Sequence, residues 1–424
     1  MEPLTHAELH RRGFLRLAGA AGLTWLTPVS QMLARAAEAP AKKGQPAQSI
    51  IMLWMNGGPS QLETFDPKPG TSIAAGTGAI DTAVKGIQLA PGLERTAEHM
   101  PSISLLRSMV SKEGDHERGA YALKTGFRPD PTVVHPSIGA VLCHELPIVG
   151  TDIPRHVSIL PGQWPNRGGF LGDKYDAFRT DDPAGAVPDT SSFLPAQRDE
   201  LRLKHLEVVE GAFAQGRQKR ADNTQHRATL DGARKMMTSE QLKAFDVSKE
   251  PLALRQEYGD TAFGRGCLAA RRLIEVGVRC VEVTLGGWDT HANNHAFHTT
   301  NLKILDPAFA ALLKDLKSRG LLEKTIVVCG GEFGRTPSIN PAGGRDHWPT
   351  GFSIAVAGGG FRGGQAVGET DPEGKKDPTR PIAIGDLHAT ILTAVGIDPA
   401  KLNQTPIGRT VPLAEGKVIP ELLM

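Results

Sequence analysis

The sequence has few cysteines, and no two of them stand in a CxxC spacing. Only four occur in 424 residues, at Cys143, Cys267, Cys280 and Cys329. Their scatter excludes a zinc ribbon and a thioredoxin-type motif. A chain of this length buries a large core, so it requires no disulfide to fold. Cys329 lies in an apolar run and is predicted to be a buried thiol.

An excess of charge of one sign is also missing. The formal net charge is +2. Residues 1–36 contain four Arg and two Glu, so without them the 48 basic and 46 acidic residues become 44 and 44. A neutral protein offers no electrostatic surface to a phosphate backbone. We therefore exclude nucleic acid as a partner.

Long hydrophobic runs are absent too. The most apolar part of the amino terminus is short and contains Arg16 and Pro28, so it is too weak to span a bilayer. Paired Arg11 and Arg12 precede it, and a small-residue cleavage site follows at residues 34–36. This pattern resembles a bacterial twin-arginine export signal. We therefore expect a periplasmic or extracellular protein with no transmembrane segment once the signal is removed.

The rest of the chain is predicted to form one α/β domain. After the signal peptide (1–36) and a polar linker (37–47), residues 48–424 contain continuous apolar runs that are typical of buried strands: "SIIMLWM", "RCVEVTL", "KTIVVCG" and "GFSIAVAG". Amphipathic helices alternate with them, which predicts right-handed crossovers and a mainly parallel sheet. Residues 127–190 are predicted to be irregular, and residues 194–278 to be a helical insertion with a solvated surface.

Polar side chains follow several of these predicted strands. Asn56 comes after the first strand, Asp289 and His291 follow "RCVEVTLGG", and Glu332 follows "KTIVVCGG". In open α/β sheets, ligands gather beyond the carboxyl ends of the strands. Imidazole and carboxylate together suit a divalent metal such as zinc, manganese or iron. We therefore predict a metal site at this edge of the sheet.

Two further segments belong to this prediction. The stretch "GEFGRTPSINPAGGRDHWP" continues from Glu332 and adds Asp346 and His347 as candidate ligands and Arg335 as a candidate holder of a tetrahedral anion. A salt bridge from Arg335 to Glu332 or Asp346 is the alternative. His116 stands at a predicted helix start, where backbone N–H groups favour anions. The histidines at 295 and 298 are predicted to be surface or capping residues instead of ligands.

These blocks stand in the order found in the alkaline phosphatase and sulfatase superfamily. The segments "LWMNGGPSQLETFDPKPG", "GGWDTHANN", "GEFGRTPSINPAGGRDHWP" and "DLHATILTAVGI" resemble those of the DUF1501 family of exported, sulfatase-like proteins. The resemblance implies a sulfatase-like α/β fold with a mainly parallel sheet flanked by helices. It also implies a bound divalent metal, one or two ions, chosen among Zn, Mn, Ca and Mg.

The resemblance further implies the role of each residue. Asn56 takes the place of a first-strand Asp ligand, and Asp289, His291, Glu332 and His347 with its neighbour Asp346 match the other ligand positions. Phe333 stands where a second member of a ligand pair is expected. The nucleophile position falls on His116, and no Ser or Thr lies between Ser111 and Thr125. His116 is therefore predicted to serve as nucleophile, general base or ligand.

Two functions follow. The first is an exported metal-dependent hydrolase of sulfate or phosphate esters, acting on small-molecule or polysaccharide substrates without a Ser, Thr or Cys nucleophile. The alternative is a catalytically degraded extracytoplasmic binding protein on the same fold. The missing hydroxyl favours the second, and the retained Asp, Glu, Arg and His residues favour the first. The sequence leaves the oligomeric state open.

Overall fold

The computed structural model describes residues 46–148, 150–185, 187–218 and 226–423. The predicted signal peptide (1–36) and nearly all of the predicted linker lie outside the described residues.

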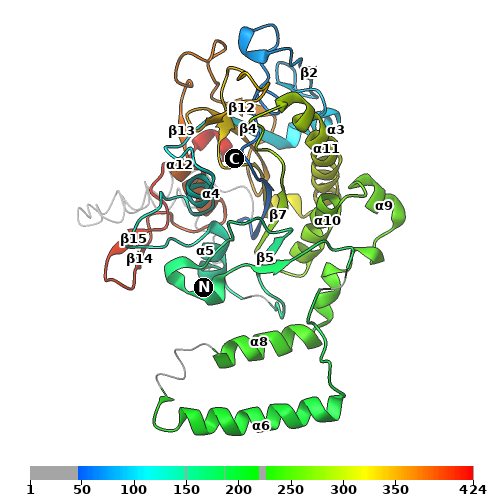
Figure 1. The fold of residues 1–424 in the computed structure, drawn as a ribbon, viewed down its shortest axis with the longest axis vertical. Helices are drawn as coiled ribbons and strands as arrows, with labels where there is room; N and C mark the ends of the chain where they lie inside the picture. The colour runs from blue at the N-terminus through cyan, green and yellow to red at the C-terminus, as the bar shows by residue number, and fades with distance from the viewer. Residues whose placement is uncertain (1–45, 149, 186, 219–225, 424) are drawn as a thin grey trace, which may run out of the picture. The chain divides into compact units, whose positions relative to one another are not determined.

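A nine-stranded sheet organises the described chain (Figure 1). At its centre β1 (Ser49–Met55) pairs in parallel with β7 (Cys280–Leu285) on one side and β8 (Thr325–Gly330) on the other. All residues of these three strands are buried, as their apolar sequences predict. The full strand order is β12 (Gln365–Val367), β4 (Ile103–Val110), β11 (Phe352–Gly358), β8, β1, β7, β5 (His156–Ile159) and β6 (Phe178–Thr180), with β13 (Ile382–Ala383) paired to β4.

One strand runs against the others. β11 is antiparallel to both β8 and β4. The helix α11 (Asn294–Ser318) connects β7 to β8, and such a crossover keeps two strands parallel. Between β8 and β11 the chain instead forms a hairpin of β9 (Gly334–Arg335) and β10 (His347–Trp348), so it returns in the opposite direction. The predicted α/β fold with a mainly parallel sheet flanked by helices is confirmed.

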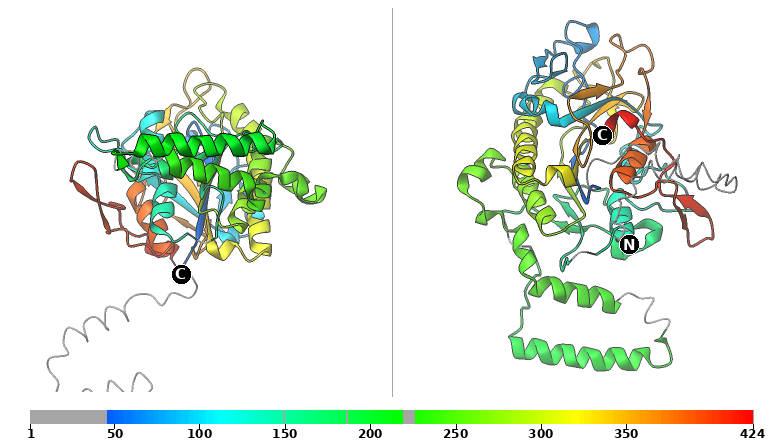
Figure 2. Two further views of the ribbon diagram at one scale, coloured as in Figure 1. Left: turned by 90° about the horizontal axis from the view of Figure 1, so that it is seen from below. Right: turned by 180° about the vertical axis from the view of Figure 1, so that it is seen from behind.

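Helices cover both faces of the sheet (Figures 1 and 2). On one face lie α4 (His116–Thr125), α5 (Ile138–Glu145) and α12 (Ile384–Ala394), and on the other lie α3 (Glu94–Glu98), α10 (Ala262–Glu275) and α11. Side chains of β1 alternate between the two cores, because successive strand residues point to opposite faces. Leu53 and Met55 pack with α10 and α11, and Met52 and Trp54 pack with α4 and α12.

Further elements lie outside this three-layer core. They are β2 (Ile80–Asp81), β3 (Gln88–Leu89), α6 (Ala196–Ala214), α8 (His226–Thr238), α9 (Leu252–Glu257), β14 (Leu402–Gln404) and β15 (Thr410–Pro412). The segment predicted as a helical insertion thus contains α6, α8, α9 and α10. Of these, α10 packs against β7 and α11 and is part of the core, whereas α6 has no buried residue.

The prediction that residues 127–190 are irregular is wrong in part. This segment contains α5, β5 and β6. The two strands have four and three residues, which is too short for a periodic pattern to show in the sequence. β5 pairs with β7 and extends the sheet on that side.

The four cysteines are all buried and free, which confirms the prediction for Cys329. Within the described ranges, no helix has both the length and the apolar character needed to cross a membrane.

A buried histidine on α12 predicts a pH-dependent stability. His388 is fully enclosed and its Nε2 donates to the carbonyl oxygen of Leu123, 2.8 Å away. Burial lowers the pKa of His388 from its ordinary value of 6.5 to about 4. Between these values the unfolded chain binds a proton that the folded protein does not. The free energy of unfolding is therefore expected to fall as the pH drops from about 6.5 to about 4.

The expected contribution of His388 is about 3 kcal/mol, since one pKa unit corresponds to ~1.4 kcal/mol. Urea unfolding at pH 7.5 and 4.5 measures it, in the parent and in His388→Gln. The variant should lose less stability than the parent over this interval. An identical pH dependence in the two proteins would rule out His388 as a cause. Between pH 7.5 and 9 His388 does not titrate, so parent and variant should show the same pH dependence of stability, and this interval is the internal control.

Candidate metal and active site

The carboxyl ends of β1 and β7 approach each other closely. Gly57, which follows β1, has a φ of +118°, a conformation that side chains other than glycine rarely adopt. A Cβ atom at this position would lie 2.4 Å from the backbone nitrogen of Asp289. The "NGG" sequence therefore allows the loop after β7 to pack directly on the end of β1, and this contact places Asp289.

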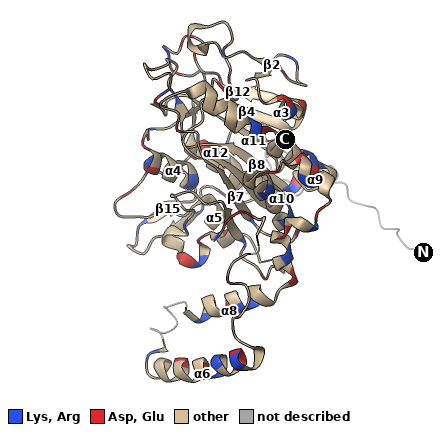
Figure 3. Cartoon of the chain, turned by 45° about the vertical axis from the view of Figure 1, so that its right-hand side comes forward, with Lys and Arg blue, Asp and Glu red and all other residues tan. Residues whose placement is uncertain are grey.

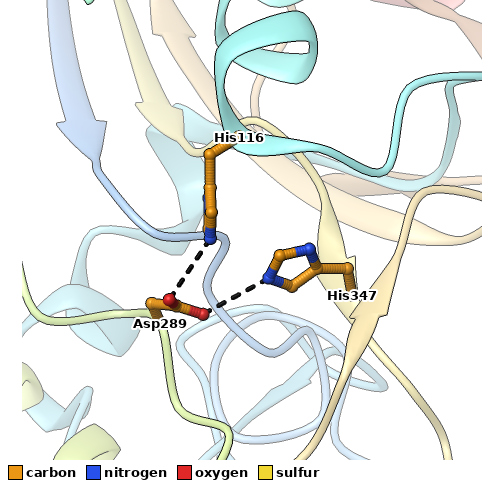
Figure 4. A group of neighbouring side chains, drawn as sticks. All are labelled: His116, Asp289 and His347. Carbon is orange, nitrogen blue, oxygen red and sulfur yellow. Dashed lines mark hydrogen bonds and ion pairs between the residues drawn. The ribbon is translucent and has the colours of Figure 1, made fainter. Parts of the chain in front are cut away.

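Asp289 is the centre of the site (Figure 4). Its Oδ1 lies 3.1 Å from Nε2 of His291 and 3.3 Å from Nε2 of His347, and its Oδ2 lies 3.3 Å from Nε2 of His116. The three histidines come from distant parts of the chain: the loop after β7, the strand β10 and the first position of α4. The fold thus gathers three imidazoles around one carboxylate.

The three imidazoles share one hydrogen-bonding arrangement. In each ring Nδ1 faces an oxygen: Oε1 of Glu332 at 2.8 Å from His116, Oδ1 of Asp346 at 2.7 Å from His291, and the carbonyl oxygen of Gly114 at 2.7 Å from His347. These oxygens accept, so Nδ1 carries the proton in each ring and Nε2 keeps its lone pair. Metal-binding histidines are commonly held in this way.

The arrangement suits a bound cation. Nε2 of His291 and Nε2 of His347 are only 3.0 Å apart. Two lone pairs at this distance repel each other unless a proton or a metal ion lies between them. Nε2 of His116 is buried and has no hydrogen-bond partner among the described residues. One donor atom each from His116, Asp289 and His347 lie within 4.8 Å of one another. The residues present therefore fit a divalent metal.

The electrostatics keep Asp289 and His347 in their metal-binding forms. Partial burial acts to raise the pKa of Asp289, but the hydrogen bond and charge of Arg335, together with His116, outweigh it and lower that pKa to about 2. Burial lowers the pKa of His347. The hydrogen bond to Glu332 raises the pKa of His116. At neutral pH Asp289 is thus an anion and His347 is uncharged.

Arg335 holds the carboxylate of Asp289. It is fully buried, and its Nη2 donates to Oδ1 of Asp289 at 2.7 Å and to the carbonyl oxygen of Gly57. Its Nε donates to Gly58 and its Nη1 to the carbonyl oxygen of Arg345, at 2.8 and 3.0 Å. Four of its five N–H donors are therefore occupied. The sequence predicted a salt bridge to Glu332 or Asp346 as the alternative to anion binding; Arg335 does form an ion pair, but its partner is Asp289, from the loop after β7.

Three residues predicted as ligands make other contacts. Glu332 is fully buried, and its Oε1 accepts from His116 and from the backbone nitrogen of Gly57, at 2.8 and 2.9 Å. Asp346 accepts from His291. The side-chain oxygen of Asn56 accepts from Nε1 of Trp54 at 3.1 Å. Glu332 and Asp346 therefore orient imidazoles, and the side chain of Asn56 turns back along its own strand.

Other residues at the site carry no signal in the sequence. The Trp164 ring stacks on His116 with the centroids 5.7 Å apart, and it comes from the segment that was predicted to be irregular. The carbonyl oxygen of Gly114 is a backbone atom, so no residue type identifies it. Asn340 donates to Oδ1 of Asp346 at 3.3 Å and to the carbonyl oxygen of His291 at 3.0 Å.

His298, one of the two histidines that were predicted not to be ligands, is structural. It is buried, and its Nε2 accepts from the backbone nitrogen of Ser60 at 2.9 Å. Burial lowers the pKa of His298 to about 4, so the ring is neutral at pH 7.

Several solved structures are similar to this chain at low sequence identity. Among solved structures it is similar to the alkaline phosphatase from the Antarctic bacterium TAB5, with 13% identity over 84% of this chain and 99% of that chain and a TM-score of 0.37. It is also similar to a sulfatase from Pseudoalteromonas sp., with 13% identity over 86% of this chain and 70% of that chain and a TM-score of 0.40. A third is the C-terminal periplasmic domain of EcEptC from Escherichia coli in complex with Zn, with 9% identity over 75% and 74% of the two chains and a TM-score of 0.34.

No curated protein matches the chain. A family described as "Protein of unknown function (DUF1501)" matches residues 47–423, which is nearly the whole described chain. The resemblance noted in the sequence is thereby confirmed, and the chain belongs to the DUF1501 family.

Proposed function

We propose that this protein is an exported, metal-dependent hydrolase of sulfate or phosphate esters that acts without a Ser, Thr or Cys nucleophile. One observation carries the proposal. The Nε2 atoms of His116, His291 and His347 all face the carboxylate of Asp289, and an oxygen atom holds each Nδ1. Three imidazoles oriented in this way around a carboxylate have a chemical use only if they share a cation or move protons.

Asp289, His291 and His347 are the residues that would hold the ion. Two imidazoles and one carboxylate leave a position open for a substrate or a water, as catalytic metal sites require. A divalent ion bound there would supply Lewis-acid polarisation of the ester and a lowered pKa for water. The 2.7 Å ion pair with Arg335 fixes the position of the Asp289 carboxylate and favours its charged form.

His116 is the general base in this proposal. Glu332 fixes its tautomer through the 2.8 Å contact to Nδ1 and leaves Nε2 to accept a proton. The attacking water gives this proton to Nε2 while its oxygen forms a bond to sulfur or phosphorus. The bond to the alcohol oxygen breaks, and the imidazolium returns the proton to the leaving alkoxide. Such a pathway needs no covalent enzyme intermediate, which agrees with the missing hydroxyl at position 116.

The test is turnover of simple esters by the exported protein loaded with zinc or manganese. An aryl sulfate, an aryl phosphate and an aryl phosphodiester are offered separately, with and without a chelator. We expect turnover of at least one ester class, and its loss in the chelator. If the protein binds the metal but turns over none of the three classes, the proposal fails and the binding-protein alternative takes its place.

A residue that only orients a ligand should have a graded effect. Asp346 is exposed and contacts the proposed metal site only through Nδ1 of His291. Asp346→Ala therefore leaves all the proposed ligands in place and removes the carboxylate that orients His291. Loss of such a partner typically weakens metal affinity about 10- to 100-fold. Titration with a competing chelator measures this change. An unchanged affinity in the variant would show that His291 is not a ligand.

A further inference from the structure

Two opposite charges are buried beside the proposed metal site. Charged residues are frequent on α6, α8 and α9, helices that bury few or no residues (Figure 3). Arg345 and Glu63 are exceptions, because their side chains are only 0% and 4% exposed, and Nη2 of Arg345 donates to Oε1 of Glu63 at 2.8 Å. Burial acts to raise the pKa of Glu63, but the charge of Arg345 and smaller contributions outweigh it and lower that pKa. Glu63 is therefore an anion at neutral pH, and the two residues form an ion pair.

Stability alone is a weak reason for such a pair. Two charges taken out of water lose their hydration, and apolar side chains of similar volume often replace a buried ion pair without loss of stability. What an ion pair can add is one fixed arrangement of the segments that carry it. The contacts of Arg345 show which segments these are.

The guanidinium of Arg345 joins the segment after β1 to the β9–β10 hairpin. Besides Glu63, Nη2 contacts the carbonyl oxygen of Ile73 at 2.9 Å, and Nη1 donates to those of Thr336, at 3.0 Å, and Pro337. Glu63 and Ile73 lie between β1 and β2, and the other two acceptors lie between β9 and β10. The donors of a guanidinium have fixed directions, so this one planar group holds the two segments at a set distance.

The backbone of Arg345 lies between the residues that would hold the ion. Its N–H donates at 3.0 Å to the carbonyl oxygen of Thr290, which directly follows Asp289. Its carbonyl oxygen accepts at 3.0 Å from Nη1 of Arg335, the residue that pairs with Asp289. His347 follows two positions later in the chain. A displacement of Arg345 would therefore move the proposed ligands relative to one another.

The two ligand-bearing segments also pack without a side chain between them. A Cβ atom at Gly344 would lie 2.0 Å from the carbonyl carbon of His291. The Nε2 atoms of His291 and His347 are 3.0 Å apart. A functional site of this kind must be held to within about 0.5 Å, which requires support from the residues around it.

We propose that the buried ion pair of Arg345 and Glu63 positions the metal ligands, because it fixes the β9–β10 hairpin against the loop after β7. The hairpin carries His347, and the loop carries Asp289 and His291. The proposal rests on the metal site of the proposed function. It makes both members of the pair positioning residues, which act through the backbone and contact neither the ion nor the substrate.

The affinity of the folded protein for Zn²⁺, measured by titration with a competing chelator, tests the proposal. Arg345→Met alone would leave Glu63 buried and unpaired, which is destabilising, so it is combined with Glu63→Gln. We expect the double variant to bind Zn²⁺ about tenfold more weakly than the parent or worse, as when a residue that orients a ligand is lost. Co²⁺ in place of Zn²⁺ gives a second readout, because its visible absorption depends on the coordination geometry, and the spectrum of the variant should differ from that of the parent.

The matched control is Arg271→Met with Asp315→Asn. These residues form another buried ion pair, 1% and 6% exposed and 2.9 Å apart, between α10 and α11. The control should keep the Zn²⁺ affinity and the Co²⁺ spectrum of the parent. An equal loss of affinity in the control would show that disturbed packing is the cause, and would overturn the proposal.

Arg345→Lys with Glu63 unchanged is the conservative variant. It keeps the charge opposite Glu63 and should bind Zn²⁺ more tightly than the double variant. If it binds no more tightly, or if the double variant binds as tightly as the parent, the positioning role is wrong while the metal site stands. A parent that binds no metal would instead refute the metal site, and with it both the proposed function and this proposal.

Discussion

Replacing Asp289 and His347 together by Ala is expected to abolish divalent metal binding. The parent, purified without a chelator, should contain one or two ions per chain. The double variant removes the carboxylate that faces all three imidazoles and one of the two nitrogens that lie 3.0 Å apart. What remains is a single pair of imidazoles without an anionic ligand, which binds a divalent ion weakly.

Elemental analysis of the folded protein measures this result, and thermal unfolding provides a second readout. An ion that binds only the folded state stabilises it by about 4 kcal/mol at a concentration a thousandfold above its dissociation constant. Chelation should therefore lower the melting temperature of the parent but not that of the double variant. Asp231→Ala with His205→Ala, two exposed residues of the same types on α8 and α6, is the matched control and should keep the metal. Equal metal content in the Asp289/His347 variant and the parent would show that the assigned ligands are wrong.

Replacing His116 by Ala is expected to lower the turnover of aryl esters at least 100-fold. Proton transfer by a positioned side chain typically contributes about 10²- to 10⁴-fold to a rate. The 2.8 Å contact with Glu332 fixes the ring and raises the pKa of His116, so the ring is held as a base whose free nitrogen faces the site. If His116 acts as a base, the variant should keep its metal while it loses its rate.

The metal content of His116→Ala separates the two remaining roles of this residue. Loss of both metal and rate would make His116 a ligand, and an unchanged rate would remove it from the mechanism. His295→Ala is the matched control because His295 lies close to the same loop but contacts Thr77 and Glu63, at 3.1 and 3.4 Å. This control should retain full turnover. The turnover of Glu332→Gln should lie between that of the parent and that of His116→Ala, because this change weakens the base without removing it.

The sequence by itself determined the architecture and which polar residues gather at one edge of the sheet. Continuous apolar runs predicted β1, β7, β8 and β11, because a strand covered by helices on both faces has no polar side. The polar residues directly after β7 and β8 predicted where the site lies, since the carboxyl ends of parallel strands meet at one edge of the sheet. These inferences need only the local pattern of apolar and polar residues and the direction of the chain, and the sequence contains both.

Only the tertiary structure decided what each polar residue contacts. Glu332 and Asp346 carry the same chemistry as Asp289, yet they accept hydrogen bonds from imidazoles while Asp289 faces three Nε2 atoms. Arg335 is fully buried with an ion pair to Asp289, and the oxygen of Asn56 is bonded to Trp54. A carboxylate, an amide or a guanidinium can bind an ion, orient a ligand or satisfy the backbone. Which of these it does depends on neighbours that are up to 278 positions away in the chain, as in the contact between Arg335 and Gly57. No local pattern encodes such neighbours.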